Sequence, residues 1–309
     1  MRALVAAPGE RGGIEIREVE EPRPADNQAV VTVRAVSLNR GECMSLRSEI
    51  DGWRPGWDLA GEVARPAADR SGPPAGARVV GWVNGGSWAE RAAARTDHLA
   101  EIPDALPFET AATLPVAGLT AVGTLSVEGS LLGRRVAITG AAGGVGRFAI
   151  QLARMAGAHV TAIVGRLERA EGLVELGAHE VHVGLATEGE PFEVILESAG
   201  GASLDAAVSR VSSDGVIVSF GNSSGDPANF DPRTFFRKGA PVMRGYFVTH
   251  ELLQRRTGRW QLSALAALVA EGRLESRIGL TVPWSDAASA IDALLERRVG
   301  GKAVLTIDA

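Results

Sequence analysis

The sequence predicts an α/β protein that combines a doubly wound parallel sheet with a β-rich domain. Up to residue 102, short strand-like runs are separated by Gly and Pro turns. The stretch Arg135–Gly165 then has the pattern strand, Gly-rich turn, helix, strand. Beyond it, candidate strands and helices alternate to about residue 245, which is typical of parallel strands joined by crossover helices.

Short apolar or alternating runs predict the strands of the β-rich part. Turns such as Pro8–Gly13 and Asp69–Gly76 separate these runs. The segment Leu38–Arg47 leaves its strand as a short helix or a loop. The predicted strands are Arg2–Ala6, Ile14–Val19, Ala29–Ser37, Leu59–Ala64, Arg78–Val83, Ser87–Ala94 and His98–Ile102.

The pattern changes at Pro107, where helical spacing begins. Ser285 is expected to cap the last helix. The predicted helices are Phe108–Leu114, Ala117–Ser126, Phe148–Met155, Leu167–Leu176, Leu204–Val211, Trp260–Glu271 and Ser285–Arg298. The predicted strands are Val136–Thr139, Val160–Val164, Glu180–Val183, Glu193–Leu196, Val216–Phe220, a strand near Pro241–Gly245, Leu280–Trp284 and Ala303–Ile307.

The Gly-rich turn predicts a dinucleotide site. Glycines allow a tight turn and let backbone N–H groups approach a pyrophosphate at a helix N-terminus. A plain turn is the alternative, but the strand before and the helix after supply the context that the motif requires. The predicted contacts are Gly140, Ala142, Gly143, Gly144, Val145 and Gly146.

The end of the second strand indicates which dinucleotide binds. A carboxylate at this tip usually accepts hydrogen bonds from the ribose of NAD. Here the strand runs into Gly165 and Arg166, with Arg169 three residues on. A guanidinium pairs with a 2′-phosphate, so we predict NADPH. The alternative is that both arginines are simply solvated, since Glu168 and Glu171 lie close by.

Composition limits the class of protein. The chain has 309 residues, enough for two domains, and a formal charge of −5 without a basic block, which argues against nucleic acid as a partner. No run is long enough for a transmembrane helix, and the N-terminus has no signal-peptide pattern, so we expect no membrane partner and a cytoplasmic protein. A single cysteine, Cys43, leaves no internal disulfide.

Several motifs together resemble the medium-chain dehydrogenase/reductase superfamily in its zinc-independent quinone oxidoreductase branch. The resemblance covers nearly the whole chain and implies a GroES-like catalytic domain, a Rossmann domain, NADPH and a homodimer. We expect residues 1–117 and 274–309 to form the catalytic domain and 118–273 the NADPH-binding domain. The motifs are Ser37–Asn39, Gly56–Val63, Gly76–Gly81, Leu114–Ala121, Gly140–Arg154, Val218–Gly225 and Gly300–Leu305.

Zinc-binding relatives carry Gly-His-Glu where this chain has Gly56–Trp57–Asp58. Cys43 lies near their first ligand but has no partner histidine. We therefore expect no metal. Short-chain reductases need a Tyr and a Lys four residues apart, whereas the only tyrosine, Tyr246, has His250 at that position, which excludes that class.

The resemblance places Leu38–Arg47 over the nicotinamide and implies catalytic roles for Asn39 and Glu42, with Asn39 also a cofactor contact. Asn39 matches the family's Asn, and Glu42 stands where the family has Asp. The alternative for Asn39 is a turn former, and Arg47 is more simply a solvated residue. Further cofactor contacts implied by the resemblance are Thr120, Ser198, Phe220, Gly221, Asn222 and Lys302, although Lys302 could also only cover the site.

The leading hypothesis is a zinc-independent, NADPH-dependent reductase of a quinone or an α,β-unsaturated carbonyl compound. The small molecule would accept hydride on carbon while charge moves to oxygen, so the protein needs hydrogen-bond donors near that oxygen. One alternative is an enoyl reductase acting on a biosynthetic, polyketide-like intermediate. Another is a dinucleotide-binding protein with little turnover.

Overall fold

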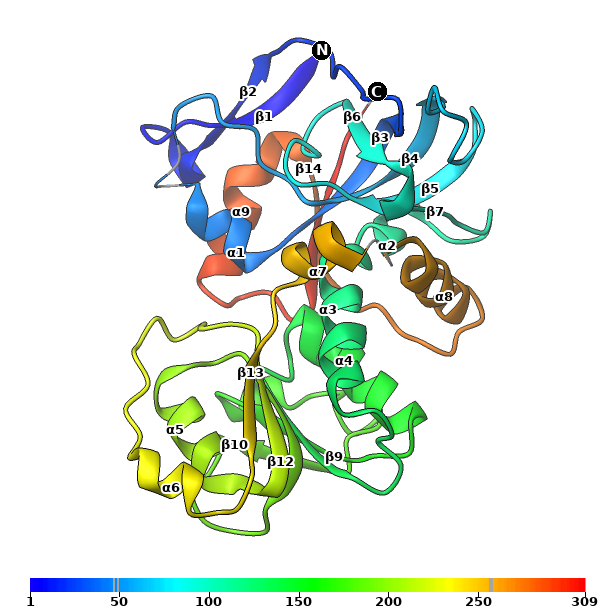
Figure 1. Ribbon diagram of the computed structural model, residues 1–309. Coiled ribbons are helices and arrows are strands. Elements are labelled where there is room, and N and C mark those ends of the chain that lie inside the picture. The colour runs from blue at the N-terminus through cyan, green and yellow to red at the C-terminus, as the bar shows by residue number, and fades with distance from the viewer. Residues whose placement is uncertain (47, 49, 256–257, 309) are drawn as a thin grey trace. The chain divides into compact units, whose positions relative to one another are not determined.

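The computed structural model describes residues 1–46, 48, 50–255 and 258–308, and divides the chain into two compact units (Figure 1). Unit 1 comprises Met1–Leu119 and Thr249–Ala309, and unit 2 is Thr120–Val248. Unit 1 resumes at Thr249, whereas the sequence predicted that the catalytic domain resumes at residue 274. Helix α8 (Gly258–Ala270) packs on strands β5 and β7 of unit 1, so this segment belongs with unit 1.

Unit 1 is built on a mostly antiparallel sheet with strand order β14-β15-β3-β4-β5-β7, and β6 also pairs with β3. A separate hairpin pairs β1 (Arg2–Ala6) with β2 (Ile14–Glu18). The strands of the sheet are β3 Gln28–Leu38, β4 Asp58–Arg65, β5 Arg78–Trp82, β6 Arg91–Arg95, β7 Leu99–Glu101, β14 Ile278–Pro283 and β15 Lys302–Thr306. The helices are α1 Arg40–Ser45, α2 Phe108–Ala111, α8 and α9 Ala287–Leu295, with short 3-10 turns η1 Arg11–Gly13, η2 Thr96–His98 and η5 Trp284–Asp286.

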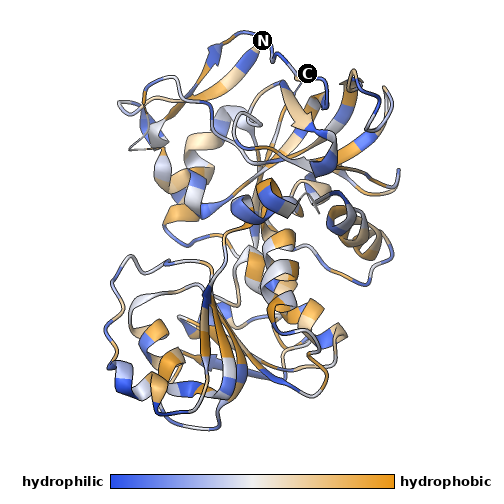
Figure 2. Cartoon of the chain, in the orientation of Figure 1, coloured by the Kyte–Doolittle hydropathy of each residue, from blue (hydrophilic) through white to orange (hydrophobic). Residues whose placement is uncertain are grey.

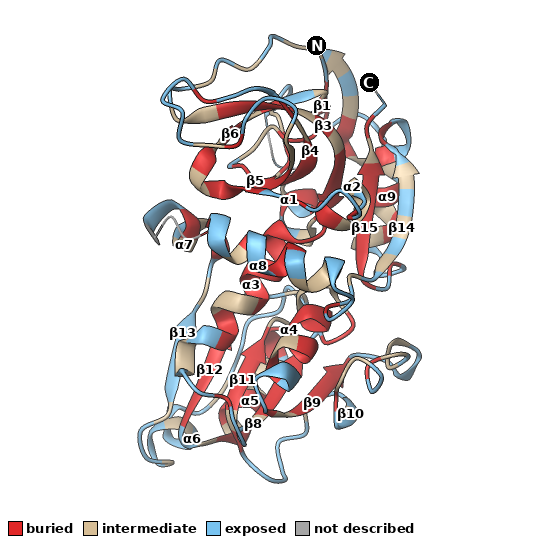
Figure 3. Cartoon of the chain, turned by 90° about the vertical axis from the view of Figure 1, so that its right-hand side faces the viewer, coloured by how far each residue is buried: buried red, intermediate tan, exposed pale blue. Residues whose placement is uncertain are grey.

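The first and last parts of the chain meet in this sheet. Strand β15 pairs antiparallel with β3 in the register Ala303 opposite Leu38. The register sets Lys302, at the start of β15, beside the residue that follows β3. Figure 3 shows β3, β4 and β15 largely buried, and apolar residues such as Val31, Trp88 and Leu305 form the core around them.

Unit 2 contains a parallel sheet with strand order β10-β9-β8-β11-β12-β13. The order reverses between β8 and β11. Right-handed crossovers that run outward in both directions from this point place their helices on opposite faces. Helix α4 accordingly packs on β8 and β9, and α5 on β11 and β12. The bounds are β8 Arg135–Thr139, α4 Gly144–Met155, β9 His159–Val164, η4 Leu167–Arg169, β10 Glu180–Val183, β11 Phe192–Glu197, α5 Gly201–Arg210, β12 Val211–Ser219, α6 Pro232–Phe236 and β13 Val242–Gly245.

The central strands of unit 2 are apolar and buried on both faces, as parallel strands covered by helices require (Figures 2 and 3). Ile138, Ile195 and Ile217 have no exposed surface. Two helices cross a unit boundary: the division after Leu119 falls inside α3 (Pro115–Leu125, followed by η3 Ser126–Glu128), and that after Val248 at the start of α7 (Val248–Arg255).

Some predicted elements differ from the structure. The predicted helix Leu167–Leu176 is only the 3-10 turn η4 followed by turns, because Gly172 has a φ of 75° and interrupts helical geometry. The last helix begins at Ala287 with Asp286, not Ser285, as its N-cap. Helices α6 and α7 were not predicted. No helix of the described residues is long and apolar enough to cross a membrane.

Candidate functional site

The Gly-rich turn lies where the strand order of unit 2 reverses. Gly140 follows β8 with a φ of 61°, and a Cβ there would lie 2.6 Å from Ser198 Oγ. A Cβ on Gly146 would lie 2.6 Å from the backbone of Ala141. Both positions therefore need glycine, one for the turn and one for close packing of helix on turn.

Helix α4 begins inside this turn without a side-chain cap. Gly143 is the N-cap, and no side chain accepts a hydrogen bond from the first turn of the helix. The first N–H groups of a helix have no intrahelical acceptor and carry partial positive charge. Gly144 and Val145 are half-buried and Gly146 is buried, so the turn offers uncapped donors in a geometry that binds phosphate.

The tip of β9 carries the predicted 2′-phosphate contacts. Gly165 and Arg166 are exposed just after the strand, and the guanidinium of Arg166 has no ion pair or hydrogen bond within the described residues. Arg169 lies at the end of η4 and is half-buried. Arg166 thus presents an uncompensated positive charge at the carboxyl edge of the parallel sheet, next to β8 and its Gly-rich turn.

A buried carboxylate ties β8 to β11 at the same edge. Glu197 is fully buried, and its Oε1 accepts hydrogen bonds from the Thr139 hydroxyl and from the backbone N–H groups of Ala199 and Gly200. Ser198 donates its N–H to Thr139 Oγ1 and its hydroxyl to Thr139 O. The sequence pattern indicated Ser198 as a site residue but not Glu197. The only sign of Glu197 in the sequence is its place as an acidic residue at the end of an apolar strand.

The remaining predicted contacts of unit 2 are placed differently from one another. Phe220 is half-buried after β12, and Gly221 and Asn222 are exposed. The Asn222 side chain closes its own turn, since its Oδ1 accepts hydrogen bonds from Ser224 Oγ and the Gly225 N–H. Thr120, a cofactor contact implied by the resemblance, lies in the middle of α3 and is buried.

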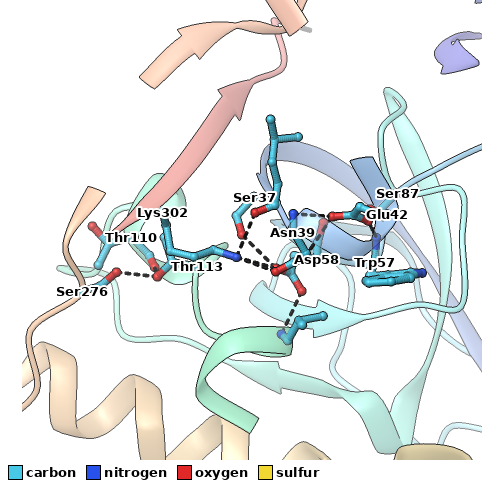
Figure 4. A network of polar contacts seen from close by, with 12 residues as sticks. Ser37, Asn39, Glu42, Trp57, Asp58, Ser87, Thr110, Thr113, Ser276 and Lys302 are labelled. Atoms are coloured by element: carbon cyan, nitrogen blue, oxygen red, sulfur yellow. Dashed lines mark hydrogen bonds and ion pairs between the residues drawn. The ribbon is translucent and has the colours of Figure 1, made fainter. Parts of the chain in front are cut away.

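Unit 1 contains a network of charged and polar side chains, here called the carboxylate network, that consists of the buried residues Ser37, Glu42, Asp58 and Lys302 and the half-buried Asn39 (Figure 4). Asp58 Oδ2 accepts hydrogen bonds from Ser37 Oγ at 2.8 Å and Asn39 Nδ2 at 2.9 Å, and it lies 3.5 Å from Lys302 Nζ. Asp58 Oδ1 accepts one from the Val116 N–H at 2.9 Å. The carboxylate is therefore fully hydrogen-bonded although it has no exposed surface.

Glu42 caps α1 from within this network. Its Oε1 accepts hydrogen bonds from the N–H of Asn39 at 2.8 Å and from Asn39 Nδ2 at 3.0 Å, and its Oε2 from the N–H of Trp57 at 3.0 Å. Burial and the charge of Asp58 raise the pKa of Glu42 to about 8, against the lowering effect of the Asn39 hydrogen bonds and of Lys302. Glu42 thus holds its proton up to a pH near 8 in the folded protein.

The predicted substrate and cofactor contacts of Asn39, Glu42 and Lys302 stay predictions, and the structure places all three side chains in the carboxylate network. Glu42 has no exposed surface, so a substrate cannot touch it in this arrangement. The Asn39 amide group donates to Glu42 and Asp58, and its Oδ1 accepts a hydrogen bond from Lys302 Nζ at 2.7 Å. Lys302 is 4% exposed and also donates to Leu38 O, so its ammonium group is already hydrogen-bonded within unit 1. Arg47 lies outside the described residues.

Known proteins resemble this chain in sequence and in fold. The family model described as zinc-binding dehydrogenase matches residues 144–261. A chloroplast envelope quinone oxidoreductase homolog of Arabidopsis thaliana is 28% identical over 96% of this chain and 95% of its own length. The Escherichia coli quinone oxidoreductase complexed with NADPH has the same fold, with a TM-score of 0.89 over 99% of this chain and 100% of that one at 24% identity. The chain belongs to the medium-chain dehydrogenase/reductase superfamily, in its quinone oxidoreductase branch.

Membership of this superfamily makes the chain an oxidoreductase. Polyketide synthases form a second group of relatives. A phenolphthiocerol/phthiocerol polyketide synthase polypeptide of Mycobacterium tuberculosis is 28% identical over 99% of this chain, which spans 15% of that much longer protein.

The name of the family model implies zinc, which requires a particular set of donor atoms. Structural and catalytic zinc sites use at least three His, Cys or carboxylate ligands. Within the described residues, no three such side chains are grouped to hold a metal ion. Burial raises the pKa of the Cys43 thiol well above its usual value, which disfavours the thiolate that zinc binds, and Lys302 already neutralises Asp58. These residues do not fit zinc.

Proposed function

We propose that this chain is an NADPH-dependent oxidoreductase that works without zinc and transfers hydride to a quinone or an α,β-unsaturated carbonyl compound. One observation carries the proposal: uncapped helix α4 follows a turn that only glycine can form, with Arg166 unpaired at the neighbouring strand tip within the described part of the chain. Membership of the quinone oxidoreductase branch and the NADPH held by the E. coli structure of the same fold support it.

The residues of unit 2 fit this cofactor. In the proposal, the N–H groups of Gly144, Val145 and Gly146 bind the pyrophosphate, and Arg166 pairs with the 2′-phosphate. Ser198 and Phe220 stand at the carboxyl ends of β11 and β12, on the edge where doubly wound sheets bind nucleotides. When bound, NADPH supplies a hydride, which together with one proton from solvent converts a quinone to a hydroquinone or saturates the C=C bond of an enone.

The carboxylate network has a positioning role in this proposal. It joins the end of β3, the start of β4, the first turn of α1 and the start of β15 through hydrogen bonds. The bonds that involve the charged groups of Asp58 and Lys302 are charge-assisted and therefore stronger than neutral ones. These contacts hold residues 39–46 and 56–58 in one fixed arrangement, in which Gly41 and Met44 are exposed and Trp57 is half-buried. Pre-organisation of this kind lets a site orient a substrate without rearranging during the reaction.

Steady-state measurement of NADPH oxidation with a panel of quinones and enones tests the activity. Gly146→Ala should abolish NADPH binding and turnover, because its Cβ would lie 2.6 Å from backbone atoms. Gly245→Ala, at an open position of the same unit, is the matched control and should behave as wild type. No oxidation above background with any acceptor would disprove the enzyme function. Binding of NADPH without turnover would instead favour the dinucleotide-binding alternative.

The enoyl reductase alternative rests on the similarity to the polyketide synthase of M. tuberculosis. It predicts that thioester-linked enoyl substrates are reduced faster than free quinones, which the same assay measures.

A homodimer remains a prediction, and the outer edge of unit 2 supports it. Strand β13 ends the sheet order and is exposed along its whole length, with Val242 52% and Met243 37% exposed. Exposed edge strands readily pair with another chain. Sedimentation velocity of the wild type and of Val242→Lys would test this, since a buried charge should produce monomers.

A further inference from the structure

The backbone conformation at Trp57 is tightly constrained. The preceding residue, Gly56, has a φ of 111°, and a Cβ there would lie 2.4 Å from Ser87 Oγ and from Trp88 Cδ1. Only glycine fits such a turn. The N–H of Trp57 donates to Glu42 Oε2 at 3.0 Å, and its carbonyl accepts from the Val83 N–H at 2.9 Å. These two hydrogen bonds and the Gly56 turn therefore fix the backbone from which the Trp57 side chain projects.

The indole ring rests on helix α1. A Cβ on Gly41 would lie 3.4 Å from Trp57 Cη2 and 3.6 Å from Cζ3, so the ring lies against the helix at the one position where no side chain intervenes. In Figure 4 the ring extends away from Asp58 and Lys302, while its backbone N–H remains attached to Glu42. The carboxylate network thus positions Trp57 through its backbone N–H, and the indole ring itself makes no hydrogen bond to the network.

The outer part of this indole is available to a ligand. Trp57 is half-buried, and its Nε1–H has no acceptor among the described residues. Trp82 and Trp88 are different, since they are 1% and 0% exposed and their Nε1 atoms are sealed in the interior. Trp57 therefore combines a rigid aromatic surface with an unused hydrogen-bond donor beside Asn39 and Glu42.

We propose that Trp57 is a specificity-determining residue that stacks on a planar conjugated ring and donates its indole N–H to a ring carbonyl oxygen. The preferred substrate is then a quinone and not an open-chain enone. Aromatic rings stack favourably in offset geometry, and a flat ring gains this contact over its full area whereas a short aliphatic enone does not. This inference rests on the proposed function and narrows its substrate class.

The test compares Trp57→Leu and Trp57→Phe with Trp260→Leu, a matched control because Trp260 is 82% exposed on α8 and far from the network in sequence. The substrates are 9,10-phenanthrenequinone and 3-penten-2-one. We expect Trp57→Leu to raise the KM for the quinone about tenfold, with kcat within about twofold of wild type, because stacking and one hydrogen bond are lost from binding. The KM for the enone should change less than about twofold, and Trp57→Phe should fall between wild type and Trp57→Leu because it keeps a ring.

A binding measurement without cofactor supplies an independent readout. Titration with the quinone should quench the tryptophan emission of wild type and of Trp260→Phe, and Trp57→Phe should lose most of this quenching. Equal KM changes for both substrates, or unchanged quinone KM and quenching in the Trp57 variants, would overturn the proposal while leaving the proposed function intact. Wild-type protein that neither binds NADPH nor reduces either substrate would overturn both.

Discussion

Replacing Lys302 with Met should destabilise unit 1 and leave unit 2 unchanged. Lys302 and Asp58 form an ion pair whose side chains are 5% and 0% exposed. Removing one partner of a buried pair costs about 3–5 kcal/mol, because the other charge stays buried. Asp58 would keep the hydrogen bonds from Ser37, Asn39 and Val116, so we expect about 3 kcal/mol, at the lower end of this range.

For a unit formed by Met1–Leu119 and Thr249–Ala309, about 1 kcal/mol shifts the melting temperature by about 2–4 °C, so Lys302→Met should lower it by about 6–12 °C. Tryptophan fluorescence is the suitable probe, since the six tryptophans, residues 53, 57, 82, 88, 260 and 284, all lie in unit 1. Lys238→Met removes the only other lysine of the chain, which lies in unit 2, and should leave this transition unchanged. A Lys302→Met transition within about 1 °C of wild type would show that the buried ion pair adds no stability.

Three further predictions concern Glu42, Arg166 and Gly56. Folding raises the Glu42 pKa from 4.5 to about 8, so the folded state holds the extra proton in this pH window. The free energy of unfolding should therefore fall as the pH rises through this window, by up to about 1.4 kcal/mol per pH unit. Urea titrations at pH 5.5–8.5 should show this slope for the wild type and not for Glu42→Gln. An unchanged slope in Glu42→Gln would contradict the raised pKa of Glu42. Arg166→Ala should raise the Kd for NADPH at least about tenfold and leave that for NADH within about twofold, while Arg134→Ala, exposed at the opposite end of the sheet, should change neither. Equal weakening of both cofactors by Arg166→Ala would exclude a 2′-phosphate contact. Gly56→Ala should lower the melting temperature of unit 1 by several degrees, about 2–4 °C for each kcal/mol of strain, and a melting temperature equal to wild type would show that the turn relaxes freely.

The Rossmann unit was predictable because its signals are local. A β-branched run, a Gly-rich turn and a helical period lie together in Arg135–Gly165, and β8, α4 and β9 follow them closely. The predicted helix Leu167–Leu176 failed for an equally local reason that helical spacing does not reveal, the left-handed backbone of Gly172. Fully buried parallel strands can be recognised from sequence since both of their faces must be apolar.

The carboxylate network was only half predictable. Asn39 and Glu42 stand three residues apart, and the sequence indicated both as site residues. Their partners Asp58 and Lys302 come from distant segments, and only the register of β15 on β3 brings Lys302 to Asn39. Asp58 had a weak signal, the Gly-Trp-Asp triplet at the place of Gly-His-Glu, but its link to Lys302 depends on long-range strand pairing that no local pattern encodes.

Because β15 comes late in the chain, the two units should fold in a defined order during synthesis on the ribosome. Unit 2 is one continuous segment, Thr120–Val248, and can fold once it emerges, whereas unit 1 must wait for its last strand. Until Lys302 arrives, the carboxylate of Asp58 lacks its ion-pair partner, and burying this charge alone is costly. A chain that stops before residue 302 would carry a folded unit 2 attached to a unit 1 sheet that lacks β15. Completion of the unit 1 sheet thus depends on β15, residues Lys302–Thr306.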